Sequence, residues 1–214
     1  MVSKLASDVQ SQVRKGIEVM RCGGIVAYPT DTVYGLGAAI NLPGAVGRVF
    51  AVKQRPLSMA FPVLLANAAQ LAQVAKEVPP VARQLIERFW PGALTIVLLK
   101  SDFVPDIVTA GSRTVAVRIP AHPVAIALIE GMGVPMVGTS ANRSGQISPV
   151  TAEGVRTQFG SEIDLVIDGG QSPGGKESTV VDATGMVPVI LREGAISVRV
   201  LQEVFGNIVV RKGE

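Results

Sequence analysis

Short apolar runs bounded by glycine, proline or polar residues constrain the fold of this chain more than any other feature. The clearest are residues 24–28, 93–99 and 114–119, which are rich in Val, Ile, Leu and Ala. Runs of this kind predict β-strands that are buried on both faces. Aromatic residues make up only 4% of the 214 residues, so aliphatic side chains must build the core. This composition suits a sheet that is covered by helices on both faces.

Helical patterns alternate with these runs. Leu5, Val9, Val13, Ile17 and Met20 recur at helical spacing, and the glycines that follow predict the end of that helix. Further helices are predicted over residues 43–53, 67–76, 80–89, 123–131, 151–159 and from 197 to before 206, and further strands over residues 61–65, 135–138, 165–167, 179–182 and 187–191. We therefore expect one α/β domain over residues 1–214, with a mixed and mostly buried sheet.

Two polar segments follow predicted strands. Residues 29–37 predict a Gly-rich turn, and residues 139–149 predict a polar loop. Open α/β folds bind their ligands in loops at the ends of strands. These two segments are therefore the first candidates for a binding site.

Charge and cysteine content exclude several classes of protein. The net charge is +3, and residues 1–60 hold seven Lys and Arg against three Asp and Glu. A positive excess this small fits solvated helix faces better than a patch that binds nucleic acid. A single cysteine, Cys22, excludes an intramolecular disulfide and a thiolate-rich zinc site, and we expect it to be buried near a helix end. The first residues do not read as a signal peptide, and no apolar run approaches the ~18 residues of a membrane span. We expect a soluble protein of a reducing cytoplasm.

Two familiar catalytic motifs are incomplete. Residues 170–176 match the spacing of a phosphate-binding P-loop, but Glu177 stands where Ser or Thr should bind Mg²⁺, and a strand rather than a helix is predicted to follow. Residues 138–142 resemble a nucleophile elbow without its second glycine. The only histidine, His122, precedes a proline at a predicted helix start, so capping is a better interpretation than a catalytic base.

Four cations stand at the ends of predicted elements. Lys53 and Arg55 end a helix before Pro56; they could hold a polyphosphate, or they could form an ordinary cation pair at a helix C-terminus. Arg118 and Arg192 end two apolar strands, where a charge either contacts a ligand or forms a buried ion pair. Together they favour an anionic ligand at the strand ends.

A set of ordered motifs makes the chain resemble the YrdC/Sua5 family of L-threonylcarbamoyladenylate synthases. The motifs lie in the family's order over about residues 10–200, namely 27–37 (AYPTDTVYGLG), 53–56 (KQRP), 89–95 (FWPGALT), 115–120 (VAVRIP), 139–145 (TSANRSG), 148–149 (SP), 178–182 (STVVD), 191–192 (LR) and 194–197 (GAIS). A chance match to this many ordered motifs is very improbable.

The resemblance implies a fold and a reaction. The fold would be a twisted mixed α/β sheet with flanking helices and a large, open, positively charged cavity. The enzyme, a nucleotidyltransferase, would convert L-threonine, bicarbonate or CO₂, and ATP to L-threonylcarbamoyl-AMP and pyrophosphate. A partner transferase would then move the threonylcarbamoyl group to adenosine 37 of tRNA. Longer family members add a C-terminal domain, which this chain is expected to lack.

The resemblance also implies site residues. They are the catalytic pair on the ATP phosphates (Lys53 and Arg55), the rest of the ATP site (Ser140, Asn142, Ser148 and Arg192), and the L-threonine site (Thr30, Tyr34, Arg118 and Ser178). Mg²⁺ would arrive on the ATP phosphates, because the sequence has no carboxylate cluster to hold it. Ala60 and Phe61 replace a Pro-Leu pair found in many members, and no histidine follows them, so the path of that loop stays open.

Two other functions remain to be tested. A non-catalytic protein that binds double-stranded RNA or tRNA would use the positive excess of residues 1–60, although few aromatic residues are present for stacking on single strands. A carbamoyl-adenylating enzyme, like the related domain of hydrogenase-maturation carbamoyltransferases, would normally carry zinc-finger parts that one cysteine cannot supply.

Overall fold

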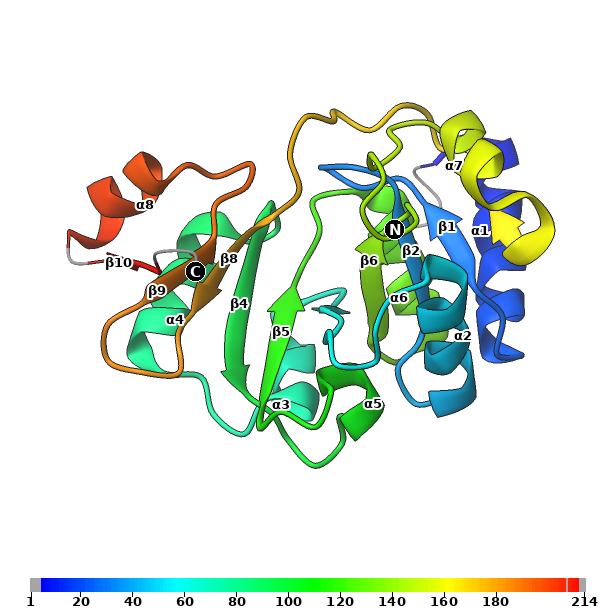
Figure 1. The fold of residues 1–214 in the computed structure, drawn as a ribbon. Helices are drawn as coiled ribbons and strands as arrows, with labels where there is room; N and C mark the ends of the chain where they lie inside the picture. The colour runs from blue at the N-terminus through cyan, green and yellow to red at the C-terminus, as the bar shows by residue number, and fades with distance from the viewer. Residues whose placement is uncertain (1–4, 207, 212–214) are drawn as a thin grey trace.

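A mixed sheet of ten strands runs through the part of the chain that the computed structural model describes, residues 5–206 and 208–211 (Figure 1). In spatial order the strands are β10-β9-β8-β4-β5-β3-β6-β2-β1-β7. Their bounds are β1 Val26–Tyr28, β2 Gly35–Ala39, β3 Val63–Leu64, β4 Leu94–Leu99, β5 Thr114–Arg118, β6 Met136–Ser140, β7 Leu165–Val166, β8 Thr179–Asp182, β9 Val189–Arg192 and β10 Val209–Val210. Parallel and antiparallel pairs both occur, so the predicted mixed α/β class is confirmed.

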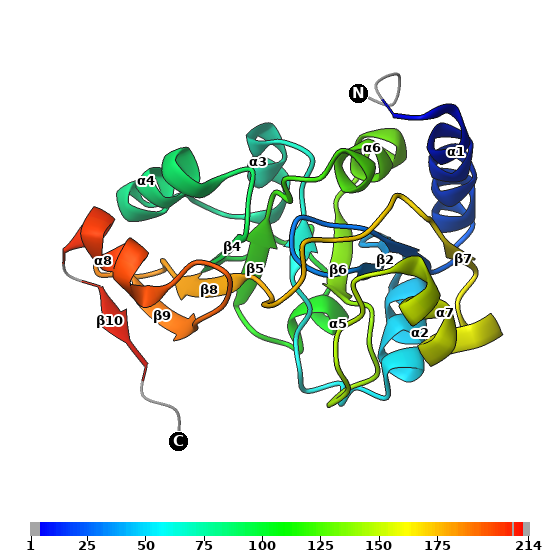
Figure 2. The same ribbon diagram turned by 90° about the horizontal axis from the view of Figure 1, so that it is seen from above.

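Helices cover both faces of this sheet. They are α1 Ser7–Arg21, α2 Pro43–Lys53, α3 Leu71–Val74, α4 Pro80–Phe89, α5 Asp106–Thr109, α6 Pro123–Met132, α7 Ala152–Phe159 and α8 Val198–Phe205, with short 3₁₀ turns at Ala68–Gln70 and Gly160–Glu162. Figure 2 shows α3, α4 and α6 along one face, with α2 and α7 on the other. Within the described ranges, no helix combines the length and the apolar character needed to cross a membrane.

The shortest central strand, β3, joins two halves of the sheet. Val63 of β3 is in register with Val117 of β5 on one side and with Val137 of β6 on the other. The half beyond β5 contains β4, β8, β9 and β10, and the half beyond β6 contains β2, β1 and β7. Because β3 provides only two residues, the segment before it, including Phe61, is free to line a cavity between the halves.

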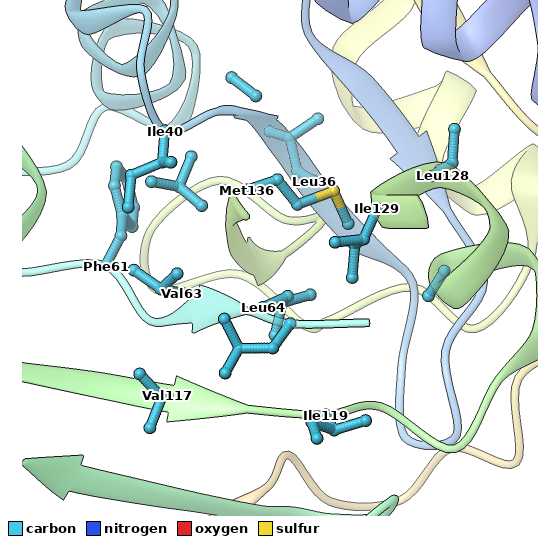
Figure 3. Packing of buried hydrophobic residues seen from close by; sticks show 14 of the residues in the cluster. Leu36, Ile40, Phe61, Val63, Leu64, Val117, Ile119, Leu128, Ile129 and Met136 are labelled. Carbon is cyan, nitrogen blue, oxygen red and sulfur yellow. The ribbon is translucent and has the colours of Figure 1, made fainter. Parts of the chain in front are cut away.

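The core is aliphatic, as the low aromatic content predicts. Figure 3 shows buried side chains of β2, β3, β5 and β6 facing those of α6. In α6 the residues from 124 to 129 are all buried, including Leu128 and Ile129. Each such aliphatic side chain contributes about 1.5–3 kcal/mol when it is removed from water. One aromatic pair, Phe50 and Phe61, joins the core with ring centroids 4.1 Å apart.

The Gly-rich turn predicted over residues 29–37 is wrong at its C-terminal end. Gly35 begins β2, a fully buried strand that pairs with β1 and β6. The ring of Tyr28 lies against this strand, and a Cβ on Gly35 would lie 2.8 Å from its Cε2 atom. A Cβ on Gly37 would lie 3.1 Å from the Tyr28 hydroxyl oxygen. The two glycines therefore make room for a ring and do not mark a turn.

Other predictions have mixed outcomes. Every predicted helix is present, and the His122 side chain accepts a hydrogen bond from the Val124 N–H (3.3 Å), which confirms its role as a cap of α6. The sequence did not predict α5 or β10, which are only four and two residues long. Strand β6 extends to Ser140, two residues into the predicted loop. Cys22 is exposed at the end of α1, so its predicted burial is wrong.

Candidate active site

A cavity of about 270 Å³ lies between the two halves of the sheet. Strands from both halves contribute to its wall, among them β2 and β6 on one side and β4, β5, β8 and β9 on the other. Seven of the ten predicted site residues line it, namely Thr30, Tyr34, Arg55, Arg118, Ser140, Ser178 and Arg192. The other three, Lys53, Asn142 and Ser148, lie behind this wall and connect to it through hydrogen bonds.

The segment between β1 and β2 brings hydroxyl groups to the cavity. The Thr30 hydroxyl donates to the Val33 carbonyl (2.7 Å) and lies 3.0 Å from the Thr32 hydroxyl oxygen. The Tyr34 hydroxyl donates to the Gly170 carbonyl (2.8 Å), which ties the segment before β8 to this wall. Burial raises the pKa of Tyr34 to about 12, so its hydroxyl stays protonated. Tyr34 therefore acts as a neutral donor that closes one side of the cavity.

Arg118 is both a cavity residue and half of a buried ion pair. Its side chain is 9% exposed, and its Nη2 atom lies 2.7 Å from Asp31 Oδ1. Its Nε atom donates to the Gly92 carbonyl (2.9 Å) and Nη1 to the Thr32 hydroxyl (3.3 Å). A guanidinium has five N–H groups, so two remain for a ligand. The buried ion pair that the sequence left open is therefore present, and the ligand contact stays a prediction.

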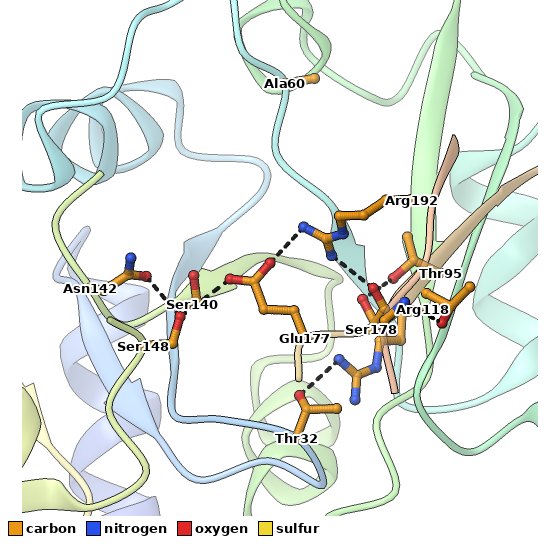
Figure 4. A network of polar contacts seen from close by, with 12 residues as sticks. Thr32, Ala60, Thr95, Arg118, Ser140, Asn142, Ser148, Glu177, Ser178 and Arg192 are labelled. Carbon is orange, nitrogen blue, oxygen red and sulfur yellow. Dashed lines mark hydrogen bonds and ion pairs between the residues drawn. The ribbon is translucent and has the colours of Figure 1, made fainter. Parts of the chain in front are cut away.

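A pair of hydroxyls lies on the opposite wall. The Ser178 hydroxyl oxygen, just before β8, lies 2.8 Å from that of Thr95 in β4. Both side chains are buried, and both line the cavity. Figure 4 shows this pair beside Arg118 and Arg192. The wall thus offers polar atoms between two of the cations.

Lys53 does not line the cavity; its side chain contacts the end of β6 and the loop that follows. Its ammonium donates to the backbone carbonyls of Ser140 (2.5 Å) and Asn142 (2.6 Å), and the Asn142 side-chain oxygen lies 3.4 Å away. Lys53 is only 2% exposed. Burial, with a smaller contribution from the positive charge of Arg55, lowers the pKa of Lys53 to about 8. In this structure the ammonium therefore holds the Ser140–Asn142 segment in place.

Arg55 points into the cavity. Its Nε donates to the Met59 carbonyl (3.0 Å) and its Nη2 to the Ala60 carbonyl (2.9 Å). Its guanidinium carbon lies 5.1 Å from the centre of the Phe61 ring, within the range of a cation–π contact. These contacts fix the loop whose path the sequence left open. Burial lowers the pKa of Arg55 from its usual value, and the neighbouring Glu177 carboxylate opposes this shift.

A chain of polar contacts runs from Arg192 to the loop held by Lys53. Glu177 Oε2 lies 2.5 Å from Arg192 Nη1, and Glu177 Oε1 accepts a hydrogen bond from the Ser148 hydroxyl (3.3 Å). The Ser148 hydroxyl also lies 3.4 Å from the Asn142 side-chain oxygen. Figure 4 shows Glu177 in the middle of this chain. The Glu177 carboxylate therefore links Arg192 to Ser148, and Ser148 extends the chain to Asn142.

Sequence reasoning missed two acidic residues of the site. Asp31 neutralises Arg118, and Glu177 neutralises Arg192. In the sequence, Glu177 marks only a departure from the P-loop pattern. Strand β8 follows it closely, which confirms that no P-loop helix is present at this point. Asp31 lies 87 residues from Arg118 in the sequence, so spacing alone gives no signal for the pair. A cation at the end of an apolar strand needs an anionic partner. A search of the sequence for such a partner could have identified both acidic residues.

Comparisons with known proteins show which family this chain belongs to. Residues 18–194 match the Sua5/YciO/YrdC family model, described as telomere recombination. The chain is 45% identical over 197 residues to a threonylcarbamoyl-AMP synthase of Pyrococcus abyssi (strain GE5 / Orsay), covering 92% of this chain and 58% of that protein. It is 41% identical over 203 residues to the enzyme of that name from Bacillus subtilis (strain 168), covering 94% and 59%. The chain thus spans less than two thirds of these relatives.

A solved structure extends the match to three dimensions. The crystal structure of P. abyssi Sua5 complexed with L-threonine superposes with a TM-score of 0.90 at 44% identity, covering 93% of this chain and 58% of that one. The family model spans the motifs that build the cavity, from the segment before β2 to Arg192 at the end of β9. The sequence match and the fold agree, and the chain belongs to the Sua5/YciO/YrdC family.

Proposed function

We propose that this chain is an L-threonylcarbamoyladenylate synthase. It would join L-threonine, bicarbonate or CO₂, and ATP, and it would release L-threonylcarbamoyl-AMP and pyrophosphate. The observation that carries the proposal is that three guanidinium groups, those of Arg55, Arg118 and Arg192, line one cavity. The described lining of that cavity contains one carboxylate, Glu177. Such a site favours two anionic ligands, one with a carboxylate and one with a polyphosphate.

The chemistry needs no protein nucleophile. The neutral threonine amine and CO₂ give a carbamate and release one proton to solvent. The anionic oxygen of the carbamate then attacks the α-phosphorus of ATP while the bond to pyrophosphate breaks. No general base is required, because the attacking oxygen already carries the charge. The protein's contribution is then to position the two reactants and to neutralise charge on the phosphates. This agrees with a cavity lined by arginine and hydroxyl side chains and by no histidine or cysteine among the described residues.

L-Threonine would occupy the side of the cavity formed by β5 and the segment before β2. Two N–H groups of Arg118 are free to bind the substrate carboxylate, while Asp31 holds the guanidinium in place. Thr30 and Tyr34 would enclose the amino acid from one side and Ser178 from the other. The name of the P. abyssi complex, which contains L-threonine, supports this class of ligand.

ATP would occupy the opposite side. Arg55 and Arg192, whose guanidinium groups line the cavity, would contact the phosphates, together with Ser140. Lys53 would act on the same subsite by holding the segment that carries Ser140 and Asn142. The Ser148 hydroxyl would support this wall from behind, next to Asn142.

Mg²⁺ would enter with ATP. Among the described residues, no group of three or more His, Cys, Asp and Glu side chains is arranged to hold a metal ion. Mg²⁺ is commonly held by substrate phosphates with few protein ligands. We therefore assign the ion to the triphosphate of the substrate, where it would neutralise part of the charge on the leaving pyrophosphate.

The product defines the next partner. L-Threonylcarbamoyl-AMP is an activated mixed anhydride, so a transferase that accepts it must follow. We propose that this transferase modifies adenosine 37 of tRNA, in the cytoplasm.

The decisive experiment measures pyrophosphate release with Mg-ATP, while L-threonine and bicarbonate are omitted in turn. Release that requires both compounds supports the proposal. Arg55→Ala should abolish release, whereas Arg199→Ala should not, because Arg199 is exposed on α8 and, within the described part of the chain, its ion-pair partner is Glu203. If the folded chain releases no pyrophosphate and binds double-stranded RNA with a steep salt dependence, a binding protein is the correct reading. Release with carbamoyl phosphate in place of threonine would instead identify a carbamoyl-adenylating enzyme.

A further inference from the structure

Glu177 is an acidic side chain placed inside a cationic cavity. Its backbone is fixed, because its carbonyl accepts a hydrogen bond from the Ala195 N–H (2.8 Å). Gly194 packs so closely that a Cβ there would lie 2.3 Å from the same carbonyl oxygen. The side chain extends from this anchor toward Arg192 and Ser148 (Figure 4). Its position in the cavity is therefore set by the fold.

The contacts of this carboxylate are those that a phosphate oxygen would make. One oxygen accepts from the Arg192 guanidinium (2.5 Å) and the other from the Ser148 hydroxyl (3.3 Å). Its charge also acts on Arg55 and Lys53, since it raises the pKa of each. A guanidinium binds a carboxylate and a phosphate through the same N–H groups. Arg192 also donates to the Ser178 carbonyl (2.8 Å). An anionic ligand that takes the Nη1 position now bound to Glu177 must therefore compete with this carboxylate.

The two ion pairs of the cavity differ in how easily they can open. Arg118 and Asp31 are 9% and 15% exposed, and Asp31 also accepts from the Ala121 N–H (3.0 Å). Arg192 and Glu177 are 48% and 38% exposed. Opening a buried pair leaves an uncompensated charge, whereas a half-exposed pair is weak and can exchange partners with water or a ligand. Exchange is therefore expected at Arg192 and not at Arg118.

We propose that Glu177 is a built-in competitor of the polyphosphate: it neutralises Arg192 in the unliganded cavity and leaves it when a polyphosphate binds. This inference rests on the proposed function, because it takes ATP and pyrophosphate as the ligands of that subsite. It makes Glu177 a specificity-determining residue. A ligand must offer Arg192 more negative charge than one carboxylate does, so the subsite admits polyphosphates in preference to single carboxylates. The same competition promotes release of pyrophosphate after the reaction.

The test compares Glu177→Gln with Glu203→Gln by isothermal titration calorimetry. Both substitutions remove one negative charge, but Glu203 lies on α8 and, among the described residues, forms its ion pair with exposed Arg199. The titrants are Mg-ATP, without L-threonine or bicarbonate, and inorganic pyrophosphate. Glu177→Gln should lower the Kd of both by about twofold to fivefold, the range for a half-exposed ion pair. The gain should shrink at high salt. Glu203→Gln should leave both Kd values unchanged.

Several outcomes would overturn the inference. Unchanged affinity in Glu177→Gln would show that the carboxylate does not compete, and weaker affinity would show that it positions Arg192 for the ligand. Glu177→Ala provides a second test if the glutamine variant melts well below wild type. A wild-type chain that binds ATP but releases no pyrophosphate refutes the proposed function alone, and the affinities still decide the role of Glu177. A chain in which neither wild type nor variant binds ATP or pyrophosphate refutes both.

Discussion

Replacing Lys53 by methionine should destabilise the fold as well as reduce turnover. A cation at a substrate site usually contributes little to stability, but the Lys53 ammonium is buried and donates to two backbone carbonyls, those of Ser140 and Asn142. Methionine nearly matches the length of the lysine stem, so the substitution removes the donors and leaves no large cavity. The two carbonyls would then be buried without their partner.

The size of the effect follows from these contacts. A buried acceptor that loses its donor costs about 1–3 kcal/mol, so two carbonyls cost about 2–6 kcal/mol. Removing a poorly solvated ammonium returns part of this, because burial lowers the pKa of Lys53 to about 8 and so disfavours its charged form. The expected net loss in unfolding free energy is about 1–3 kcal/mol at pH 7. For a chain of this size that lowers the Tm by about 3–10 °C.

Urea denaturation followed by circular dichroism measures this loss. Lys76→Met is the matched control, since Lys76 is 60% exposed and its pair with Asp102 spans 3.7 Å; it should change stability by less than about 0.5 kcal/mol. The reasoning would be refuted if Lys53→Met lost all turnover and kept wild-type stability. That result would mean that the ammonium acts on the substrate and that its contacts with the loop after β6 contribute nothing.

Three further predictions follow from the site and its surroundings. Tyr28 has a buried hydroxyl without a hydrogen-bond partner among the described residues, so Tyr28→Phe should raise the unfolding free energy by about 1 kcal/mol. Tyr34→Phe loses a hydrogen bond to a backbone carbonyl and should lower the unfolding free energy by about 0.5–1.5 kcal/mol. Equal effects of the two substitutions in urea denaturation would contradict this prediction. Arg118→Lys keeps a charge beside Asp31 but loses the fork, so steady-state assays should show a larger rise in the KM for L-threonine than for ATP; the reverse would exchange the two subsites. Folding lowers the pKa of Lys53 from 10.5 to about 8, so between pH 8 and pH 10.5 the unfolded chain binds more protons than the folded chain. The unfolding free energy should therefore rise with pH in this range. This rise should be absent in Lys53→Met.

The sequence predicts strongly periodic elements well and close packing poorly. The periodicity of residues 5–20 predicts α1, and the apolar runs predict β4 and β5, because local pattern determines these elements. Strand β2 was not predicted, because Gly35 and Gly37 are typical of turns when read locally. The Tyr28 ring, which packs across the sheet, explains both glycines, and at Gly37 a Cβ would also lie 2.6 Å from the Val137 carbonyl oxygen. Such a contact joins separate strands, so no local pattern reveals it.

For Lys53 and Arg55, too, the sequence shows the residues but not their contacts. Sequence places Lys53 and Arg55 together at the end of α2 and assigns both to phosphate. In the structure Gln54 ends the helix with φ of 53°, a left-handed conformation that turns the chain between them. Lys53 therefore contacts the loop after β6, while Arg55 lines the cavity. The sequence identifies both residues as site candidates. It does not reveal the left-handed backbone of Gln54, which separates the directions of the two side chains.

Two of the three cavity arginines are balanced by a carboxylate before any ligand arrives. Arg118 is neutralised by Asp31 and Arg192 by Glu177, and Arg55 donates to carbonyls of its own loop. An unpaired cluster of arginines would destabilise the fold through mutual repulsion, so this balance allows a cationic site to exist in a stable chain. The buried pair keeps Arg118 oriented with two N–H groups free, which suits recognition of one carboxylate. The half-exposed pair at Arg192 exchanges its anion, which suits a polyphosphate that must bind before the reaction and leave after it.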